Sequence, residues 1–191
     1  FGPKAATEVV KRNGPCKIVT ATNVFAHIEH VHEIVESILA MLDHDGIFIS
    51  ESHYLLPLIE TLQYDTIYHE HLRYYSLQSL KYLLEMHELE IIHAKRIPTH
   101  GGSIRVYAAR KGQKAIQPSV AELLAVENQQ LTWEQFMDFR SRASQSKLDL
   151  MAMLKKIRGK GEKVYGIGAP SRASTLVNYV GLDDSNIDCV M

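Results

Sequence analysis

The residues best suited to chemistry lie in one stretch, Tyr64 to Ser76. It places two imidazoles, two carboxylates, a guanidinium and four phenols within thirteen residues. Its apolar side chains follow neither the helical nor the strand period, so the stretch is predicted to be a polar loop. Because α/β enzymes keep their chemistry in loops at the ends of strands, we expect this loop to face an active site.

Within this loop, His71 fits the role of a general base, because an imidazole exchanges protons near neutral pH. Glu70 is expected to orient or tune a partner in the site, and Tyr68 to bind or polarise a substrate. Two alternatives stay open. The spacing of His69 and His71 also suits a metal ion, and these side chains can equally serve ordinary hydrogen bonds within a loop.

The segments before the loop predict a strand, a helix and a second strand. Residues 16–21 are β-rich and apolar enough to be a central parallel strand. Residues 31–42 show one apolar stripe of helical spacing, which residues 43–46 end, and residues 47–51 form a second buried strand. Such a βαβ unit is expected to have a right-handed crossover.

After the loop, Ser76 is a good cap for the next helix, and the strands predicted at 89–97 and 103–110 form an antiparallel pair. This pair is expected to close one edge of an otherwise parallel sheet. Residues 111–114 are a plausible linker.

The remaining residues predict helices and one further strand. Capping boxes are predicted at Ser119 with Glu122 and at Thr132 with Gln135, the second of which opens a long helix. A strand over 163–168 then runs into a glycine turn and a helix, which begins a second, incomplete βαβ unit.

Further candidate residues stand at the ends of the predicted elements. Asn23 and His27 follow the first strand, at the edge where open α/β sheets bind ligands. His27 equally suits a helix start without a ligand. In the turn between the paired strands, the glycines after His100, beginning with Gly101, let the backbone approach a ligand closely.

Two places are candidates for holding a sugar or a phosphate. Ser103 and Arg105 follow the turn, and arginine is a two-pronged donor. The glycine turn that begins at Gly166 runs into a helix, where free amides and the helix dipole favour a phosphate. The alternatives are an ordinary hairpin with an exposed arginine and a glycine turn whose role is geometric.

Composition narrows the classes of function. The net charge of -1 over 191 residues gives no general attraction to nucleic acid or to an anionic membrane. No apolar run approaches the ~20 residues that span a bilayer. The start, Phe1 to Lys4, lacks the basic region followed by an apolar one that marks a signal peptide, so none is expected. Cys16 and Cys189 are too far apart for a C-x-x-C zinc site. We expect a cytoplasmic protein, and both ends of the sequence look cut.

Four stretches together resemble the sugar C-methyltransferases, which use S-adenosylmethionine to methylate a carbon of a nucleotide-linked keto-deoxysugar. They are Asn23–His27, Asp65–His71, Thr99–Arg105 and Tyr165–Arg172, in an order and spacing that fit nearly the whole chain. The family has a cysteine-rich zinc domain followed by two Rossmann-like domains.

The resemblance implies that residues 1–111 are the second half of a class I methyltransferase domain. Residues 112–191 would then begin the C-terminal Rossmann-like domain. The fold expected is α/β, with a partial Rossmann-like sheet, an antiparallel edge hairpin, then helices and a truncated second Rossmann-like domain. Zinc would belong only to an N-terminal domain that is missing here. The glycine-rich turn and the acidic residue that hold the cofactor in such enzymes are also missing, so this chain is expected to hold S-adenosylmethionine poorly.

The resemblance also assigns roles. His71 would be the general base that takes a proton from the carbon next to the ketone, with Glu70 as its companion and Tyr68 near the substrate. Asn23 and His27 would lie beside the cofactor, and the partner would be a nucleotide-diphosphate sugar. The residues predicted to bind it are His100, Gly101, Ser103, Arg105, Ser171 and Arg172.

Two other functions compete with this one. The first is a nucleotide-sugar binding module without catalysis, or an inactive fragment of such an enzyme. The second is an NAD-dependent sugar oxidoreductase, which is disfavoured because the turn at Gly166 lacks the third glycine of the G-x-G-x-x-G pattern.

Overall fold

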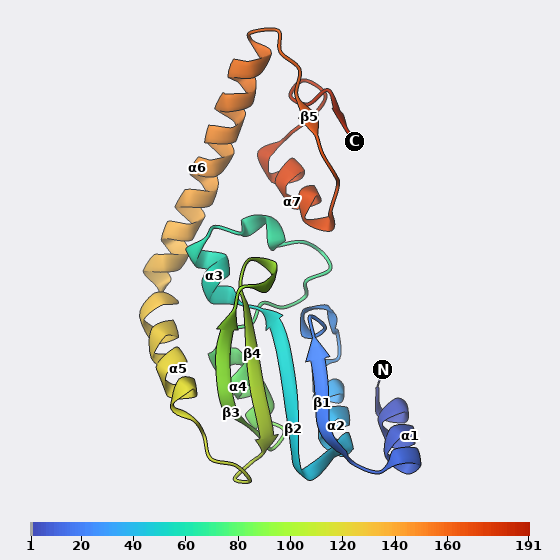
Figure 1. Cartoon of the computed structure of the whole chain (residues 1–191). Coiled ribbons are helices and arrows are strands. Elements are labelled where there is room, and N and C mark those ends of the chain that lie inside the picture. The colour runs from blue at the N-terminus through green and yellow to red at the C-terminus, as the bar shows by residue number, and fades with distance from the viewer. Residues whose placement is uncertain (1) are drawn as a thin grey trace. The chain divides into compact units, whose positions relative to one another are not determined.

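Four strands form one sheet in the order β1-β2-β4-β3 in the computed structural model, which describes residues 2–191 (Figure 1). They span Cys16–Thr22 (β1), Leu42–His53 (β2), Leu89–Ile97 (β3) and Ser103–Arg110 (β4). β1 and β2 are parallel, whereas β4 is antiparallel to both β2 and β3. The predicted α/β class, with an antiparallel hairpin at one edge of the sheet, is confirmed.

The chain divides into two compact units. The first comprises Phe1–Pro57 and Leu72–Leu131 and holds the four-stranded sheet, and the second comprises Leu58–His71 and Thr132–Met191. The polar loop up to His71 therefore belongs to the second unit. The domain boundary predicted between residues 111 and 112 stays a prediction.

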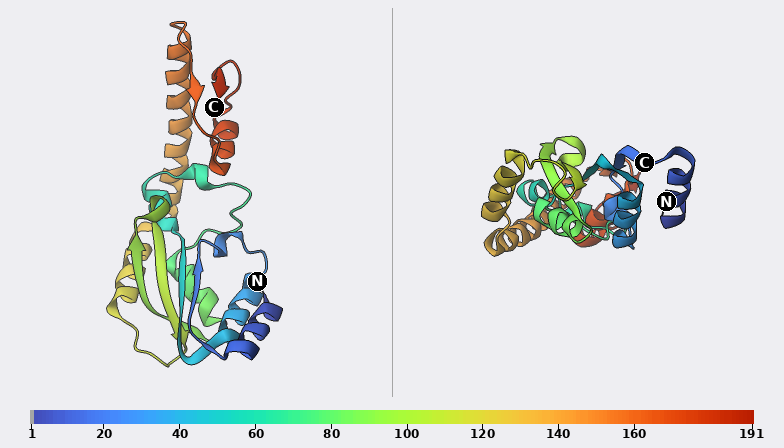
Figure 2. Two further views of the ribbon diagram at one scale, coloured as in Figure 1. Left: turned by 45° about the vertical axis from the view of Figure 1, so that its right-hand side comes forward. Right: turned by 90° about the horizontal axis from the view of Figure 1, so that it is seen from below.

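Helices of the first unit pack on the sheet. α2 and α4 lie on the same side of it, and α5 lies along β3 (Figure 2). The bounds of these helices, of the N-terminal helix α1 and of the short helix α3 are Pro3–Asn13 (α1), Val31–Met41 (α2), Leu55–Glu60 (α3), Leu77–Glu85 (α4) and Pro118–Gln130 (α5). None of the helices within residues 2–191 is both long and apolar enough to span a membrane.

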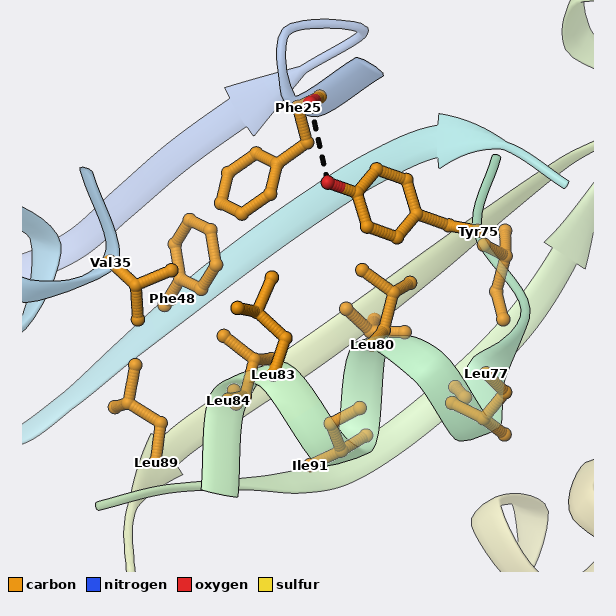
Figure 3. Close-up of a cluster of buried hydrophobic side chains, with 14 of the residues drawn as sticks. Phe25, Val35, Phe48, Tyr75, Leu77, Leu80, Leu83, Leu84, Leu89 and Ile91 are labelled. Atoms are coloured by element: carbon orange, nitrogen blue, oxygen red, sulfur yellow. Dashed lines mark hydrogen bonds between the residues drawn. The ribbon is translucent and has the colours of Figure 1, made fainter. Parts of the chain in front are cut away.

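The core of this unit lies between the sheet and these helices. Phe25 packs against Phe48 with ring centroids 5.9 Å apart, and Tyr75 meets Phe25 edge-on at 6.3 Å (Figure 3). The Tyr75 hydroxyl donates to the carbonyl oxygen of Phe25 at 3.3 Å. Burial raises the pKa of Tyr75 to about 12, so the phenol stays neutral and keeps donating this bond.

The backbone amides in the first turn of α4, from Leu77 to Leu80, all have hydrogen-bond acceptors. As predicted, Ser76 caps the helix: its hydroxyl accepts from the Ser79 amide, and its carbonyl oxygen accepts from Leu80. The buried carboxylate of Glu127, on α5, accepts from the amides of Leu77 and Gln78. A carboxylate at this end also complements the helix dipole.

The second unit is built around a long helix and a small parallel sheet. Its elements are Trp133–Arg158 (α6), Tyr165–Gly166 (β5), Ser171–Val180 (α7) and Cys189–Val190 (β6). Thr132 caps α6 by accepting from the Gln135 amide at 3.3 Å, and Gly181 ends α7 in a left-handed conformation (φ 81°). Strand, helix and parallel strand follow one another here as predicted.

Three local predictions are wrong. In the sheet that residues 2–191 form, β1 is an edge strand and not a central one, and Ile18 is 63% exposed, because apolar composition predicts a strand but not its place in the sheet. Residues 43–46, predicted to lie between the helix and the second strand, already belong to β2. They form its irregular start, where the register between β1 and β2 shifts after Cys16. Ser119 does not cap α5: Gln117 is the cap residue, and the Ser119 hydroxyl instead lies 2.7 Å from Nδ1 of His93.

Candidate active site

The polar loop of the second unit holds the His71 ring in a defined orientation. Its Nδ1 lies 3.1 Å from the carbonyl oxygen of Thr66, and its Nε2 lies 3.2 Å from the hydroxyl of Tyr68. A carbonyl oxygen can only accept, so Nδ1 carries the proton of the neutral ring. Nε2 is therefore the basic nitrogen, and Tyr68 donates to it.

The Tyr68 phenol is a neutral donor beside that nitrogen. Desolvation by burial, and then the negative charge of Glu70, raise its pKa. The rings of Tyr68 and His71 also pack against each other, with centroids 4.4 Å apart and their planes tilted by 35°, and the His71 amide donates to the Tyr68 carbonyl at 3.0 Å. Tyr68 and His71, both predicted to be catalytic, are thus in direct contact.

Glu70 lies next to two other polar side chains of the second unit. Its Oε1 accepts from the hydroxyl of Ser171 at 3.2 Å and lies 4.0 Å from Nε2 of His69. His69 is largely exposed, with its side chain 81% accessible. Within residues 2–191, no three His, Cys, Asp or Glu side chains gather in a way that would hold a metal ion.

Arg172, predicted to bind a phosphate, forms a two-pronged ion pair with a residue of the loop. Its Nε and Nη2 donate to the two carboxylate oxygens of Asp65 at 2.8 and 2.7 Å. These hydrogen bonds raise the pKa of Arg172. The sequence analysis assigned no role to Asp65, although this residue lies in the polar loop that was predicted to face an active site.

A cavity of about 690 Å³ lies beside these residues in the same unit. Its walls come from the glycine turn Gly166–Pro170, from α7 and from two residues of the loop, Asp65 and His69. Ser171 and Arg172 line it as well. The turn therefore borders a space of the size that small-molecule ligands occupy.

In the first unit, Asn23 follows the carboxyl end of β1 in a left-handed conformation (φ 54°), and its amide donates to the Glu51 carbonyl at 2.8 Å. His27 ends a 3-10 turn at Phe25–His27. The next segment of chain is tied to this turn, because the Leu72 amide donates to the Ala26 carbonyl at 2.8 Å. Both candidate residues are thus exposed at the strand end where they were expected.

The segment that directly follows His71 is anchored by an arginine. The guanidinium of Arg73 donates to the carbonyl oxygens of Ile28 and Glu29, the second at 2.9 Å. Both carbonyls lie just beyond the 3-10 turn that ends at His27.

One cavity of the first unit has a lining whose chemistry partly suits S-adenosylmethionine, the cofactor that the resemblance implies. A cavity of about 540 Å³ is lined by apolar side chains that include Val24, Ile28 and Ile34, and by the carboxylates of Glu29 and Glu33. Apolar walls suit an adenine ring, and carboxylates suit a cation. β1 is followed by Asn23 and Val24 instead of a glycine-rich turn. The residues of this unit therefore suit only part of the cofactor.

The turn between β3 and β4 is held by a buried carboxylate. Glu51, 6% exposed, accepts two hydrogen bonds from Arg105 on one oxygen (3.0 and 2.7 Å) and one from the Thr99 hydroxyl on the other (3.2 Å). The hydrogen bond to Glu51 is the main cause that raises the pKa of Arg105. Neither Glu51 nor Thr99 was predicted to be a site residue, because no pattern in the sequence indicates that a carboxylate on a strand accepts hydrogen bonds from the residues of a turn.

Within that turn, His100 and Gly101 have positive φ values of 53° and 82° and are exposed. Ser103 is fully buried, and its hydroxyl donates to the Thr99 carbonyl at 3.1 Å. The substrate-binding roles predicted for these residues stay predictions, as do the roles of His71, Glu70 and Tyr68.

Two family models match the chain one after the other. Residues 2–94 match the methyltransferase domain, and residues 98–191 match the C-methyltransferase C-terminal domain. The C-methyltransferase NovU of Streptomyces niveus is 35% identical over 190 residues, which are 98% of this chain and 45% of NovU. The chain therefore spans about half the length of this relative.

Solved structures of methyltransferases are more distant. A S-adenosylmethionine-dependent methyltransferase of Clostridium acetobutylicum is 14% identical, with a TM-score of 0.42 over 52% of this chain and 60% of that one. Magnesium protoporphyrin IX methyltransferase of Synechocystis, solved with bound SAH, is 14% identical, with a TM-score of 0.40 over 51% and 46%.

The two domain matches and the relative point to the same family. The domain matches follow each other along the chain with only a short gap, and the similarity to the relative extends over nearly the whole of this chain. This chain belongs to the C-methyltransferases.

Proposed function

We propose that the whole protein transfers a methyl group from S-adenosylmethionine to a carbon of a nucleotide-linked keto-deoxysugar, with His71 as the general base. The observation that carries the proposal is the orientation of the His71 ring. The Thr66 carbonyl fixes the proton on Nδ1, which leaves Nε2 as the basic atom beside the neutral Tyr68 phenol.

In this mechanism, Nε2 of His71 takes the proton from the carbon next to the ketone, and the electron pair of that C–H bond becomes the enolate. The Tyr68 hydroxyl, 3.2 Å from Nε2, turns toward the developing enolate oxygen and donates to it. Burial keeps this phenol protonated, as a donor requires. S-adenosylmethionine, when bound, supplies the electrophilic methyl group that the carbon receives.

Substrate binding is proposed at two places. Beside the cavity of the second unit, Ser171 and Arg172 stand at the start of α7, where a helix favours phosphate oxygens. In the first unit, His100 and Gly101 present an exposed, tightly turned backbone. The buried contacts of Ser103 and Arg105 would act there by fixing the shape of that turn.

The test is His71→Asn in the whole protein. Methyl transfer should fall by at least ~10²-fold, the usual contribution of a general base, while binding of the sugar nucleotide stays within about twofold. His44→Asn is the matched control, since His44 is an exposed residue of β2. Turnover like that of the wild type in His71→Asn would remove the base from the mechanism.

A second candidate is a nucleotide-sugar binding module without catalysis. The cavity at the glycine turn favours such a module, because all the residues that line it belong to the second unit. A nucleotide sugar would bind there without a cofactor. Calorimetry separates the two functions. Binding of both S-adenosylhomocysteine and a thymidine-diphosphate sugar supports the enzyme, whereas binding of the sugar nucleotide alone supports the module.

A further inference from the structure

One face of α7 contacts the loop that carries His71. Arg172, Thr175 and Tyr179 share this face, because residues three and four apart lie above one another on a helix. Each of them contacts a different residue of the loop in the same unit. The partners are, in order, the carboxylate of Asp65 (2.8 and 2.7 Å), the carbonyl oxygen of Ile67 (2.8 Å) and the ring of Tyr64 (centroids 5.3 Å apart).

The two polar contacts lie on either side of the group that orients the base. Thr66 is the residue between Asp65 and Ile67, and its carbonyl oxygen is the partner of Nδ1 of His71. The Thr66 carbonyl belongs to a peptide group whose amide, that of Ile67, donates to the Tyr64 carbonyl at 3.1 Å. α7 therefore contacts the loop on both sides of the residue whose carbonyl orients the His71 ring.

Folding stability does not explain this arrangement well. The Arg172 side chain is 44% exposed and that of Asp65 is 24% exposed, and an ion pair near the surface adds little to stability. The fork geometry instead gives directional precision, because both carboxylate oxygens are held at once. Arg172 and Asp65 are also 107 residues apart in sequence, so local structure does not impose the contact.

We propose that Arg172 and Thr175 are positioning residues, which hold the Thr66 carbonyl and thereby keep Nε2 of His71 aimed for proton removal. This inference rests on the proposed function of His71. It gives Arg172 a use beyond binding a phosphate, and the two uses predict different kinetics. A residue that only binds substrate affects mainly KM, whereas one that positions the base affects mainly kcat.

The first experiment needs no activity. In the chain of 191 residues, hydrogen exchange of the His71 amide and the NMR resonances of the His71 ring are compared between wild type, Arg172→Gln and Thr175→Val. Both variants should speed exchange of this amide by about tenfold and shift the ring resonances, because the loop opens more often. Arg158→Gln is the control, since it breaks a similar ion pair of the same unit, with Asp188 at 2.7 Å. Unchanged exchange and resonances in both variants would overturn the proposal.

The second experiment measures kinetics in the whole protein. Arg172→Gln and Thr175→Val should lower kcat by about tenfold with KM for the sugar nucleotide within twofold. Combining Asp65→Arg with Arg172→Asp should recover part of the loss relative to either single variant. A rise in KM alone would assign Arg172 to substrate binding and refute positioning. If the wild type itself transfers no methyl group, the proposed function fails, while the hydrogen-exchange result still decides whether α7 orients His71.

Discussion

Removing the carboxylate of Glu127 should weaken the first unit through a single, well-defined loss. Glu127 is 2% exposed, and it accepts hydrogen bonds from the amides of Leu77 and Gln78 at the start of α4. The other amides of this turn, those of Ser79 and Leu80, are satisfied by Ser76. Glu127→Ala therefore leaves two amides without their acceptor and changes nothing else in the cap.

The size of the effect follows from these bonds. Each hydrogen bond to a charged group contributes about 1.5–3 kcal/mol net, and a carboxylate at a helix N-terminus adds about 0.3–1 kcal/mol through the dipole. Water reaching the exposed amides returns part of this energy. We expect Glu127→Ala to lower the free energy of unfolding by about 3 kcal/mol, and Glu127→Gln, which keeps an amide oxygen as acceptor, by about half as much.

The assay combines urea unfolding followed by circular dichroism with hydrogen exchange. The unfolding midpoint should fall at an unchanged m-value, and the amides of Leu77 and Gln78 should exchange faster than those of Ser79 and Leu80. Glu122→Ala is the control on the same helix, because Glu122 is exposed. If Glu127→Ala is as stable as this control, the carboxylate does not hold α4 and the reasoning is refuted.

Two further predictions concern the first unit. Gly102→Ala should destabilise the protein by about 2–4 kcal/mol in urea unfolding, because Gly102 has φ 122° and a Cβ there would lie 2.6 Å from Pro57. Gly112→Ala, where φ is 74° and the space is open, should cost only about 1 kcal/mol, and equal losses would contradict the steric argument. Because burial raises the pKa of Tyr75 to about 12, its phenol keeps its proton in the folded state while the unfolded phenol ionises near its ordinary value. Stability should therefore fall as pH rises from about 10 toward 12, and Tyr75→Phe should lessen this fall; an identical pH dependence in the variant would show that Tyr75 does not cause it.

Patterns of short range predicted most elements of the fold correctly. The helical stripe over 31–42 became α2, the cap at Ser76 became the start of α4, and the alternating residues after Gly102 became β4. These succeed because hydrophobic period and capping chemistry depend on residues within a few positions of one another.

The place of a strand within its sheet could not be predicted in this way. Residues 16–21 have the composition of a central strand, yet β1 lies at an edge of the sheet that residues 2–191 form. Strand order depends on pairing between segments far apart in sequence, for which composition carries no signal. The same reason explains Ser119, whose hydroxyl contacts His93 on β3 instead of capping its own helix.

For the candidate site, the sequence by itself determined which chemical groups are present: an imidazole, phenols and carboxylates in one polar loop, and an arginine beside a glycine turn. Only the tertiary structure decided how these groups pair. It directs Nδ1 of His71 to the Thr66 carbonyl and joins Arg172 to Asp65 across 107 residues. The physical reason is that hydrogen bonds and ion pairs act over a few ångströms in space, whatever the distance along the chain.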